Sequence, residues 1–77
     1  MNFIELPLCE VNEKGVIRSL GKIYLKGDMV MVVRPLWDRD FNLVPDCCMI
    51  FLQNNIAFGV HRPASEVVEL LTERSFT

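Results

Sequence analysis

The chain has 77 residues, ten acidic and eight basic side chains, and a formal net charge of −2. This length fits a single domain (residues 1–77), and the slight acidity excludes the strong positive field of a nonspecific nucleic-acid binder. Hydrophobic residues make up 51% of the chain, yet no apolar run approaches the roughly 20 residues that cross a bilayer, so no membrane insertion is expected.

Two strands are predicted in the first third of the chain. In residues 3–9 apolar residues alternate on one face, and Pro7 lacks a backbone donor, which places this strand at a sheet edge. A turn is expected at residues 12–15. Residues 16–25 fit a strand or a helix, but they contain an interior glycine, which costs a helix about 1 kcal/mol and favours the strand.

The segments 29–33 and 47–52 are apolar on both alternating faces. A sheet with one solvated face alternates apolar and polar residues, so these strands are predicted to be buried above and below. One short helix covers only one face, and the other is expected to meet another copy of the chain or a partner. The predicted oligomer interface comprises Met29, Met31, Val33, Cys47, Met49 and Phe51.

The remaining elements follow from turn residues and helical spacing. The strand over 29–33 is expected to end before Pro35, because proline cannot continue a central ladder, and residues 36–46 to form a polar and aromatic loop. Residues 53–55 predict a hairpin turn between strands over 47–52 and 56–60, and Pro63 opens an amphipathic helix. The predicted fold class is α+β: a small antiparallel sheet of four to five strands with one C-terminal amphipathic helix.

Four segments of the chain resemble the FlbD-type flagellar and swarming-motility proteins, a group of very small bacterial and phage proteins. These segments are Phe3-Ile-Glu-Leu6, Asp28-Met-Val-Met-Val-Val-Arg-Pro35, Met49-Ile-Phe-Leu-Gln-Asn54 and Pro63-Ala-Ser-Glu-Val-Val-Glu-Leu-Leu71. The chain departs from that pattern where the family has an Asn-Gly turn and this sequence has Asn54-Asn55. The resemblance implies the same small architecture and a non-enzymatic role, and it transfers no catalytic residue.

The segment from Arg34 to Phe41 is the predicted contact for a partner protein. It joins the single tryptophan, Trp37, to Arg34 and Arg39, and these residue types dominate binding hot spots. The candidate partner-binding residues are Arg34, Trp37, Arg39 and Phe41. The alternative is that Trp37 and Phe41 fold back onto the core.

Two other kinds of ligand are alternatives. Arg34, His61 and Arg62 would bind a nucleotide or another small anion, because cations beside a helix N-terminus favour negative charge; a polar strand exit is the simpler interpretation. A nucleic-acid contact is the third hypothesis, and a solvated face is again simpler. The residues of that basic group are Lys14, Arg18, Lys22 and Lys26.

The sequence shows no catalytic or metal-binding pattern. Cys9, Cys47 and Cys48 do not form an even disulfide set and are interpreted as buried apolar residues. The lone His61 has no neighbour at ligand spacing, so no metal site is expected. No nucleophile motif is present, so neither an enzyme nor a cofactor is expected. The start of the chain lacks a signal pattern, which makes the cytoplasm the expected location. The predicted function is that of a non-catalytic, self-associating interaction protein, a bacterial regulator or phage-type inhibitor of a partner.

Overall fold

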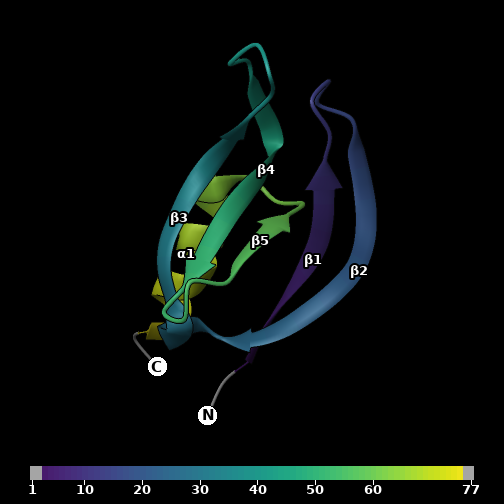
Figure 1. Ribbon diagram of the computed structural model, residues 1–77. Helices are drawn as coiled ribbons and strands as arrows, with labels where there is room; N and C mark the ends of the chain where they lie inside the picture. Colours follow the sequence, from purple (N-terminus) through teal and green to yellow (C-terminus); the bar gives the residue numbers. More distant parts are fainter. Residues whose placement is uncertain (1–2, 76–77) are drawn as a thin grey trace.

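The computed structural model describes residues 3–75 and shows one five-stranded antiparallel sheet with a C-terminal helix (Figure 1). The elements are β1 (Phe3–Val11), β2 (Ile17–Lys26), the 3₁₀ turn η1 (Gly27–Met29), β3 (Val30–Trp37), β4 (Leu43–Leu52), β5 (Ala57–Val60) and α1 (Ala64–Ser75). The strand order is β2-β1-β5-β4-β3. The predicted α+β fold is therefore confirmed.

The ambiguous second segment is a strand, as its glycines indicated. Gly15 and Gly21 have φ values of +81° and +95°, which a right-handed helix does not contain. Gly21 pairs with Leu8, and the next pair joins Cys9 to Ser19, so Leu20 is an extra residue that forms a bulge in β2.

The placement of β1 at an edge was wrong, because β1 lies between β2 and β5. The carbonyl of Pro7 accepts a hydrogen bond of 2.8 Å from the backbone N–H of His61, so the nitrogen of Pro7 faces the same side. There β5 has already ended at Val60. The donor that proline lacks therefore falls where no ladder partner requires it.

The predicted end of the third strand before Pro35 and the predicted loop over 36–46 were also wrong. β3 continues through Pro35 to Trp37, because β3 is an edge strand and edges tolerate proline. β4 already begins at Leu43, which leaves a turn only at residues 38–42. Its pairing with β3 passes from Leu36–Val44 to Pro35–Cys48, so three residues of β4 between Val44 and Cys48 bulge out.

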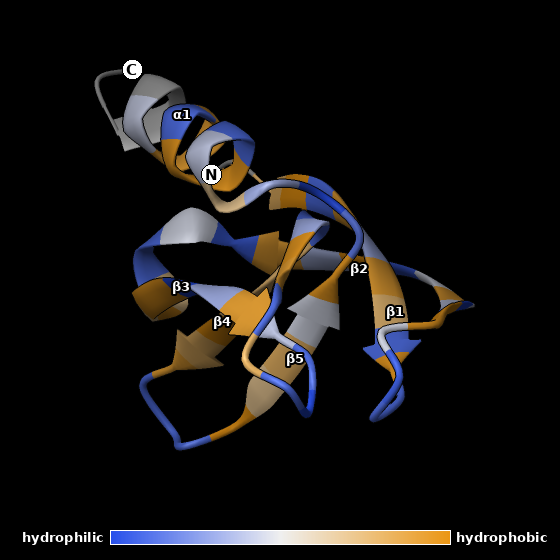
Figure 2. Cartoon of the chain, turned by 90° about the horizontal axis from the view of Figure 1, so that it is seen from above, coloured by the Kyte–Doolittle hydropathy of each residue, from blue (hydrophilic) through white to orange (hydrophobic). Residues whose placement is uncertain are grey.

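The main core lies between the curved sheet and α1. The helix contacts β3, β4 and η1 and lies to one side of the strands, and the turns between strands are largely hydrophilic (Figure 2). Both strands of the β1–β2 hairpin and both strands of the β3–β4 hairpin contribute to this core or pack against it. Val67 of the helix is fully buried there. The buried residues are Ile4, Leu6, Leu25, Cys48, Ile50, Val60 and Val67.

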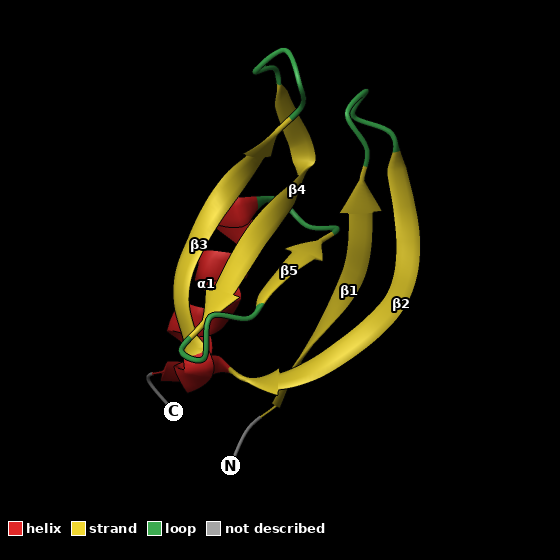
Figure 3. Cartoon of the chain, viewed as in Figure 1, coloured by secondary structure: helices red, strands yellow, loops and turns green. Residues whose placement is uncertain are grey.

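A second, smaller core explains part of the two-faced pattern of β4. Cys48 faces the main core, whereas its neighbour Cys47 packs with Cys9 and Val44, and Val11, Ile17 and Leu36 surround them. The far ends of the β1–β2 and β3–β4 hairpins pack together there. The face of β4 that carries Cys47, opposite the main core, is therefore covered in part by the same chain. The two hairpin ends lie at the same end of the molecule (Figure 3).

Within residues 3–75, no helix combines the length and the hydrophobicity needed to traverse a bilayer.

Candidate functional site

The turn at residues 38–42 is the centre of the candidate site. The backbone N–H of Asp38 donates to the carbonyl of Asn42 (2.9 Å), and that of Phe41 donates to the carbonyl of Asp38 (3.1 Å). One carboxylate oxygen of Asp38, Oδ1, accepts the backbone N–H groups of Asp40 and Asn42, each at 2.9 Å. Aspartate side chains commonly close turns in this way, so the conformation of the turn is fixed locally.

Phe41 occupies the one position in this turn that favours glycine. Its φ is +63°, a region in which an ordinary side chain crowds its own backbone at a cost of about 1–2 kcal/mol. The side chain is 88% exposed, so no burial within the chain offsets that cost. Phe41 thus has a strained backbone, and its ring gains almost no burial on folding that would offset the strain.

Beside this turn lies a groove of about 390 Å³, here called the Trp37 groove. Trp37 is 49% exposed, and Arg34, Trp37 and Phe41 all line the groove, so three of the four predicted partner-binding residues come together. The alternative in which Phe41 folds onto the core is excluded by its exposure. The described residues that line it are Val11, Arg34, Pro35, Leu36, Trp37, Asp38, Phe41 and Met49.

The fourth predicted contact, Arg39, forms an exposed ion pair within the chain. Its guanidinium lies 3.0 Å from the carboxylate of Glu13, and its backbone N–H donates to the carbonyl of Glu13 at 3.1 Å. Arg39 therefore joins the 38–42 turn to the turn between β1 and β2.

Arg34 differs from the other arginines whose side chains the structure describes. Arg18, Arg39 and Arg62 each have a carboxylate within 4 Å, at 3.6, 3.0 and 3.8 Å, and Arg34 has none among the described side chains. Its guanidinium instead lies over the ring of Phe51, 5.2 Å from the centroid. This cation–π contact orients the group and leaves its N–H donors free of a carboxylate.

The predicted oligomer interface does not form one continuous surface. Met31 is 65% exposed, Met29 is also exposed, and Met49 and Phe51 are half-buried. Cys47, in contrast, is buried in the second core.

Val33 is the second residue that leaves the predicted set. It pairs with Ile50 and packs against the main core, because Met31 is an extra residue between the pairs Val30–Leu52 and Val32–Phe51. This bulge inverts the alternation, so Val32 replaces Val33 on the outer face.

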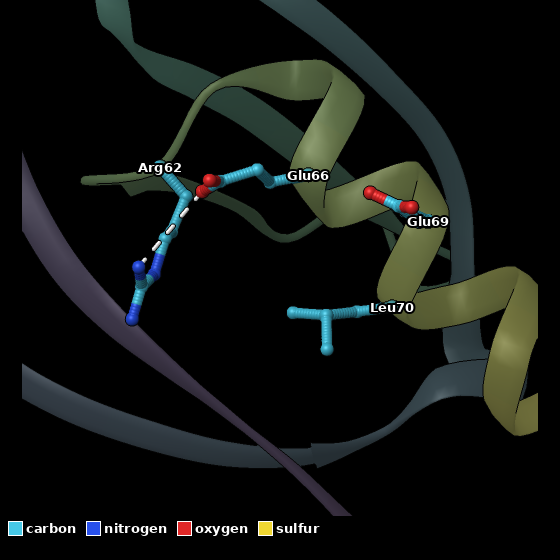
Figure 4. Close-up of a pocket in the computed structure, with 4 residues that line it drawn as sticks. All are labelled: Arg62, Glu66, Glu69 and Leu70. Atoms are coloured by element: carbon cyan, nitrogen blue, oxygen red, sulfur yellow. Dashed lines mark ion pairs between the residues drawn. The ribbon is translucent and has the colours of Figure 1, made fainter.

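The residues of the anion hypothesis are not gathered at one place. Arg34 lines the Trp37 groove, whereas Arg62 lines a separate pocket of about 370 Å³ with Glu66, Glu69 and Leu70 (Figure 4). Arg62 pairs with Glu66 in that pocket, and two carboxylates there oppose the binding of an anion. His61 is exposed, and its backbone N–H donates a hydrogen bond to the carbonyl of Pro7.

The basic residues of the nucleic-acid hypothesis are partly neutralised. Lys22 lies 3.0 Å from Glu5 and lowers the pKa of that carboxyl, and Arg18 pairs with Glu10. The outer face of β1 and β2 is thus a surface of exposed ion pairs, which matches the simpler interpretation of these cations as a solvated face.

The described residues contain no group of three or more histidine, cysteine or acidic side chains placed to hold a metal ion. The Sγ atoms of Cys9 and Cys47 lie 3.7 Å apart in the second core. Burial raises the pKa of Cys47 to about 12 and that of Cys48 to about 11, so both thiols are protonated at neutral pH. Protonated, buried thiols are poor nucleophiles.

The candidate partner-binding residues did not include five residues that also line the Trp37 groove: Val11, Pro35, Leu36, Asp38 and Met49. One signal was present in the sequence. Asn12 and Asp38 each stand three residues before the turn position with positive φ, Gly15 in one case and Phe41 in the other. That spacing marks Phe41 as an aromatic residue at a glycine position.

Comparison of the chain with models of protein families, with curated proteins and with solved structures finds no match. The resemblance to FlbD-type proteins therefore stays a prediction.

Proposed function

We propose that the protein is a non-catalytic binding module that recognises a partner protein through the Trp37 groove and thereby regulates or inhibits that partner. The observation that carries the proposal is Phe41, which combines positive φ with 88% exposure. A glycine at this position would relieve the backbone strain and remove the exposed ring. An aromatic residue that folding disfavours is accounted for when binding uses it.

The composition of the groove supports the same proposal. Trp37 and Arg34 are residue types that dominate binding energies, and they lie beside Met49, which adapts to varied shapes. The groove is open and mainly apolar, and its conformation is held by the Asp38 turn and by the ion pair between Arg39 and Glu13. A preformed surface loses little entropy on binding.

We also propose that the chain self-associates through the outer face of β3 and β4. Val32 and Met31 are exposed there, and the half-buried Phe51 and Met49 lie beside them on the same sheet. Contiguous exposed apolar residues of this kind mark interfaces. The proposed location is the cytoplasm, as an odd number of cysteines suits a reducing compartment.

Affinity capture with matched variants tests the partner assignment. Wild-type protein, Phe41→Gly and Tyr24→Ser are immobilised and exposed to a lysate of the source organism, and the captured proteins are quantified by mass spectrometry. Tyr24 is the control, because it is an exposed aromatic residue on β2, outside the lining of the groove. We expect a protein held equally by wild type and Tyr24→Ser and at least about tenfold less by Phe41→Gly, a loss of about 1.4 kcal/mol. Capture that is indifferent to Phe41 would contradict the assignment.

Native mass spectrometry tests self-association. We expect wild type to form a dimer or larger assembly and Val32→Asp to be a monomer with an unchanged circular dichroism spectrum, because Val32 is exposed within the chain. A wild-type monomer at micromolar concentration would refute this part of the proposal.

A further inference from the structure

We propose that the Trp37 groove recognises an extended partner segment in which an aspartate or glutamate lies about two or four residues from a large apolar side chain, the carboxylate binding Arg34 and the apolar side chain entering beside Trp37 and Phe41. This inference rests on the proposed function and specifies the chemistry of the partner.

The acidic residue is inferred from Arg34. Of the four arginine side chains that the structure describes, it is the one without a carboxylate within 4 Å. Its immediate neighbours are apolar, because Met49 is its cross-strand partner and the Phe51 ring lies beneath its guanidinium. A charge in such surroundings attracts an opposite charge more strongly than one in open water does. A guanidinium presents paired N–H donors that match a carboxylate.

The large apolar residue is inferred from the other end of the groove. Trp37 is half-exposed and Phe41 is almost fully exposed, and Val11 lines the groove with them. An apolar side chain that covers these groups removes their surface from water at about 25 cal/mol per Å². The groove thus has a cationic end and an aromatic end.

The spacing follows from strand geometry. Arg34 and Trp37 are three residues apart on β3, which corresponds to roughly 10 Å at about 3.3 Å per residue. An extended partner segment covers that distance in about three residues, and only alternate side chains of such a segment share a face. An acidic residue and an apolar residue about two or four positions apart therefore face the groove together and bracket this distance.

Asp38, the one acidic residue in the lining, does not oppose this arrangement. It lies four residues beyond Arg34, roughly 13 Å along an extended strand, which exceeds the screening length of about 8 Å at physiological salt. Its Oδ1 atom is also held by two backbone N–H groups, from Asp40 and Asn42. The repulsion between Asp38 and a carboxylate at Arg34 is therefore weak.

Selection from a displayed library of random 12-residue peptides tests the inference. The library is selected in parallel on wild type, Arg34→Glu and Arg18→Glu, the last being an exposed arginine on β2 that serves as the matched control. Melting temperatures of all three proteins are measured first, to show that each is folded. We expect wild type and Arg18→Glu to enrich peptides with an acidic residue about two or four positions from Trp, Phe or Leu. Arg34→Glu should instead enrich lysine or arginine at that position.

Synthetic versions of the selected peptides complete the test. We expect a wild-type-selected peptide to bind Arg34→Glu at least about tenfold more weakly, and replacement of its acidic residue by the amide to have a similar effect on wild type. Peptides that depend on Phe41 but show no acidic preference would overturn this inference and leave the proposed function standing. Peptides that bind Phe41→Gly and Trp37→Ala as well as wild type would overturn both. A selection that yields no peptide would overturn the inference alone, because the capture experiment tests the groove independently.

Discussion

The turns at residues 12–16 and 38–42 have the same backbone hydrogen bonds and differ at the position with positive φ. In the first, Asn12 accepts the N–H groups of Lys14 and Val16, and Gly15 has a φ of +81°. The turn at 38–42 repeats this pattern around Asp38, but the residue with positive φ is Phe41.

A third turn has asparagine, rather than glycine or phenylalanine, at the position with positive φ. Between β4 and β5, Asn55 has a φ of +67° in a turn closed by Leu52 and Ile56. Asparagine tolerates this conformation better than most residues, and glycine tolerates it best. Two of the three turns thus satisfy the demands of folding, and the one beside the Trp37 groove does not. This difference is the observation on which the proposed binding role of Phe41 rests.

The largest effect we expect concerns the thiols that lie beneath the two similar turns. Burial raises the pKa of Cys47 from 9.0 to about 12, so at pH 8 the native thiol has on the order of a thousandfold less thiolate than the unfolded thiol and reacts correspondingly more slowly with a disulfide reagent. Stopped-flow measurement with and without denaturant checks this rate.

The same shift predicts a loss of stability in alkali. Between pH 9 and about 12 the folded chain holds protons that the unfolded chain has lost, so the free energy of unfolding falls as pH rises. Urea titrations at pH 8 and pH 11 measure it, and Cys47→Ala, which lacks the thiol, should show a smaller decrease. Rapid labelling of native Cys47 would contradict its burial.

The next prediction concerns the close contact between β1 and β5 at Gly59. A Cβ atom added at Gly59 would lie 2.5 Å from the carbonyl oxygen of Cys9, so Gly59→Ala forces β1 away from β5. We expect a loss of about 2–3 kcal/mol in the free energy of unfolding, measured by urea titration. Gly21→Ala is the control for backbone strain, since nothing lies within 4 Å of its added Cβ atom, and it should cost about 1–2 kcal/mol. Equal losses in the two variants would argue against a steric role for Gly59.

Exchange of the residues with positive φ tests the comparison directly. Phe41→Gly should stabilise the protein by about 0.5–1 kcal/mol, because relief of strain exceeds the entropy cost of glycine. Gly15→Phe should destabilise it by about 1–2 kcal/mol. Thermal unfolding of both variants and of Phe41→Asn measures the differences. A Phe41→Gly protein less stable than wild type would mean that the ring supports the fold.

The smallest effect concerns the contact between the two turns. Arg39 and Glu13 are both largely exposed, so a double-mutant cycle with Arg39→Ala and Glu13→Ala should give a coupling energy of about 0.2–1 kcal/mol that falls with added salt. A coupling above about 2 kcal/mol would show that the ion pair is desolvated.

The sequence was sufficient to predict most elements of the fold. Alternating apolar residues, turn residues and the spacing of the last segment located β1, β2, β4, β5 and α1 to within a few residues. The errors came from residues whose meaning depends on neighbours: Pro7 and Pro35 are tolerated for reasons of strand order, which local patterns do not contain.

The candidate site was predictable in part. Arg34, Trp37 and Phe41 were selected by residue type, and they do line one groove. The partner of Arg39, Glu13, lies in another hairpin, and the inversion at Met31 arises from a bulge, so neither could be inferred from sequence spacing. The apolar character of β4 on both faces was correctly identified, but part of its second face is covered by Cys9 and its neighbours.

The strand order has a consequence for how the chain folds. β1 pairs with β2, β3 with β4, and β4 with β5, and each of these ladders joins strands adjacent in sequence. Within residues 3–75, the one ladder between distant strands is the single pair Leu8–Val60, which closes a loop of roughly fifty residues. Local hairpins form in microseconds, whereas contacts of high sequence separation form slowly. We therefore expect the closure of β1 onto β5, where Gly59 lies against Cys9, to limit the rate of folding.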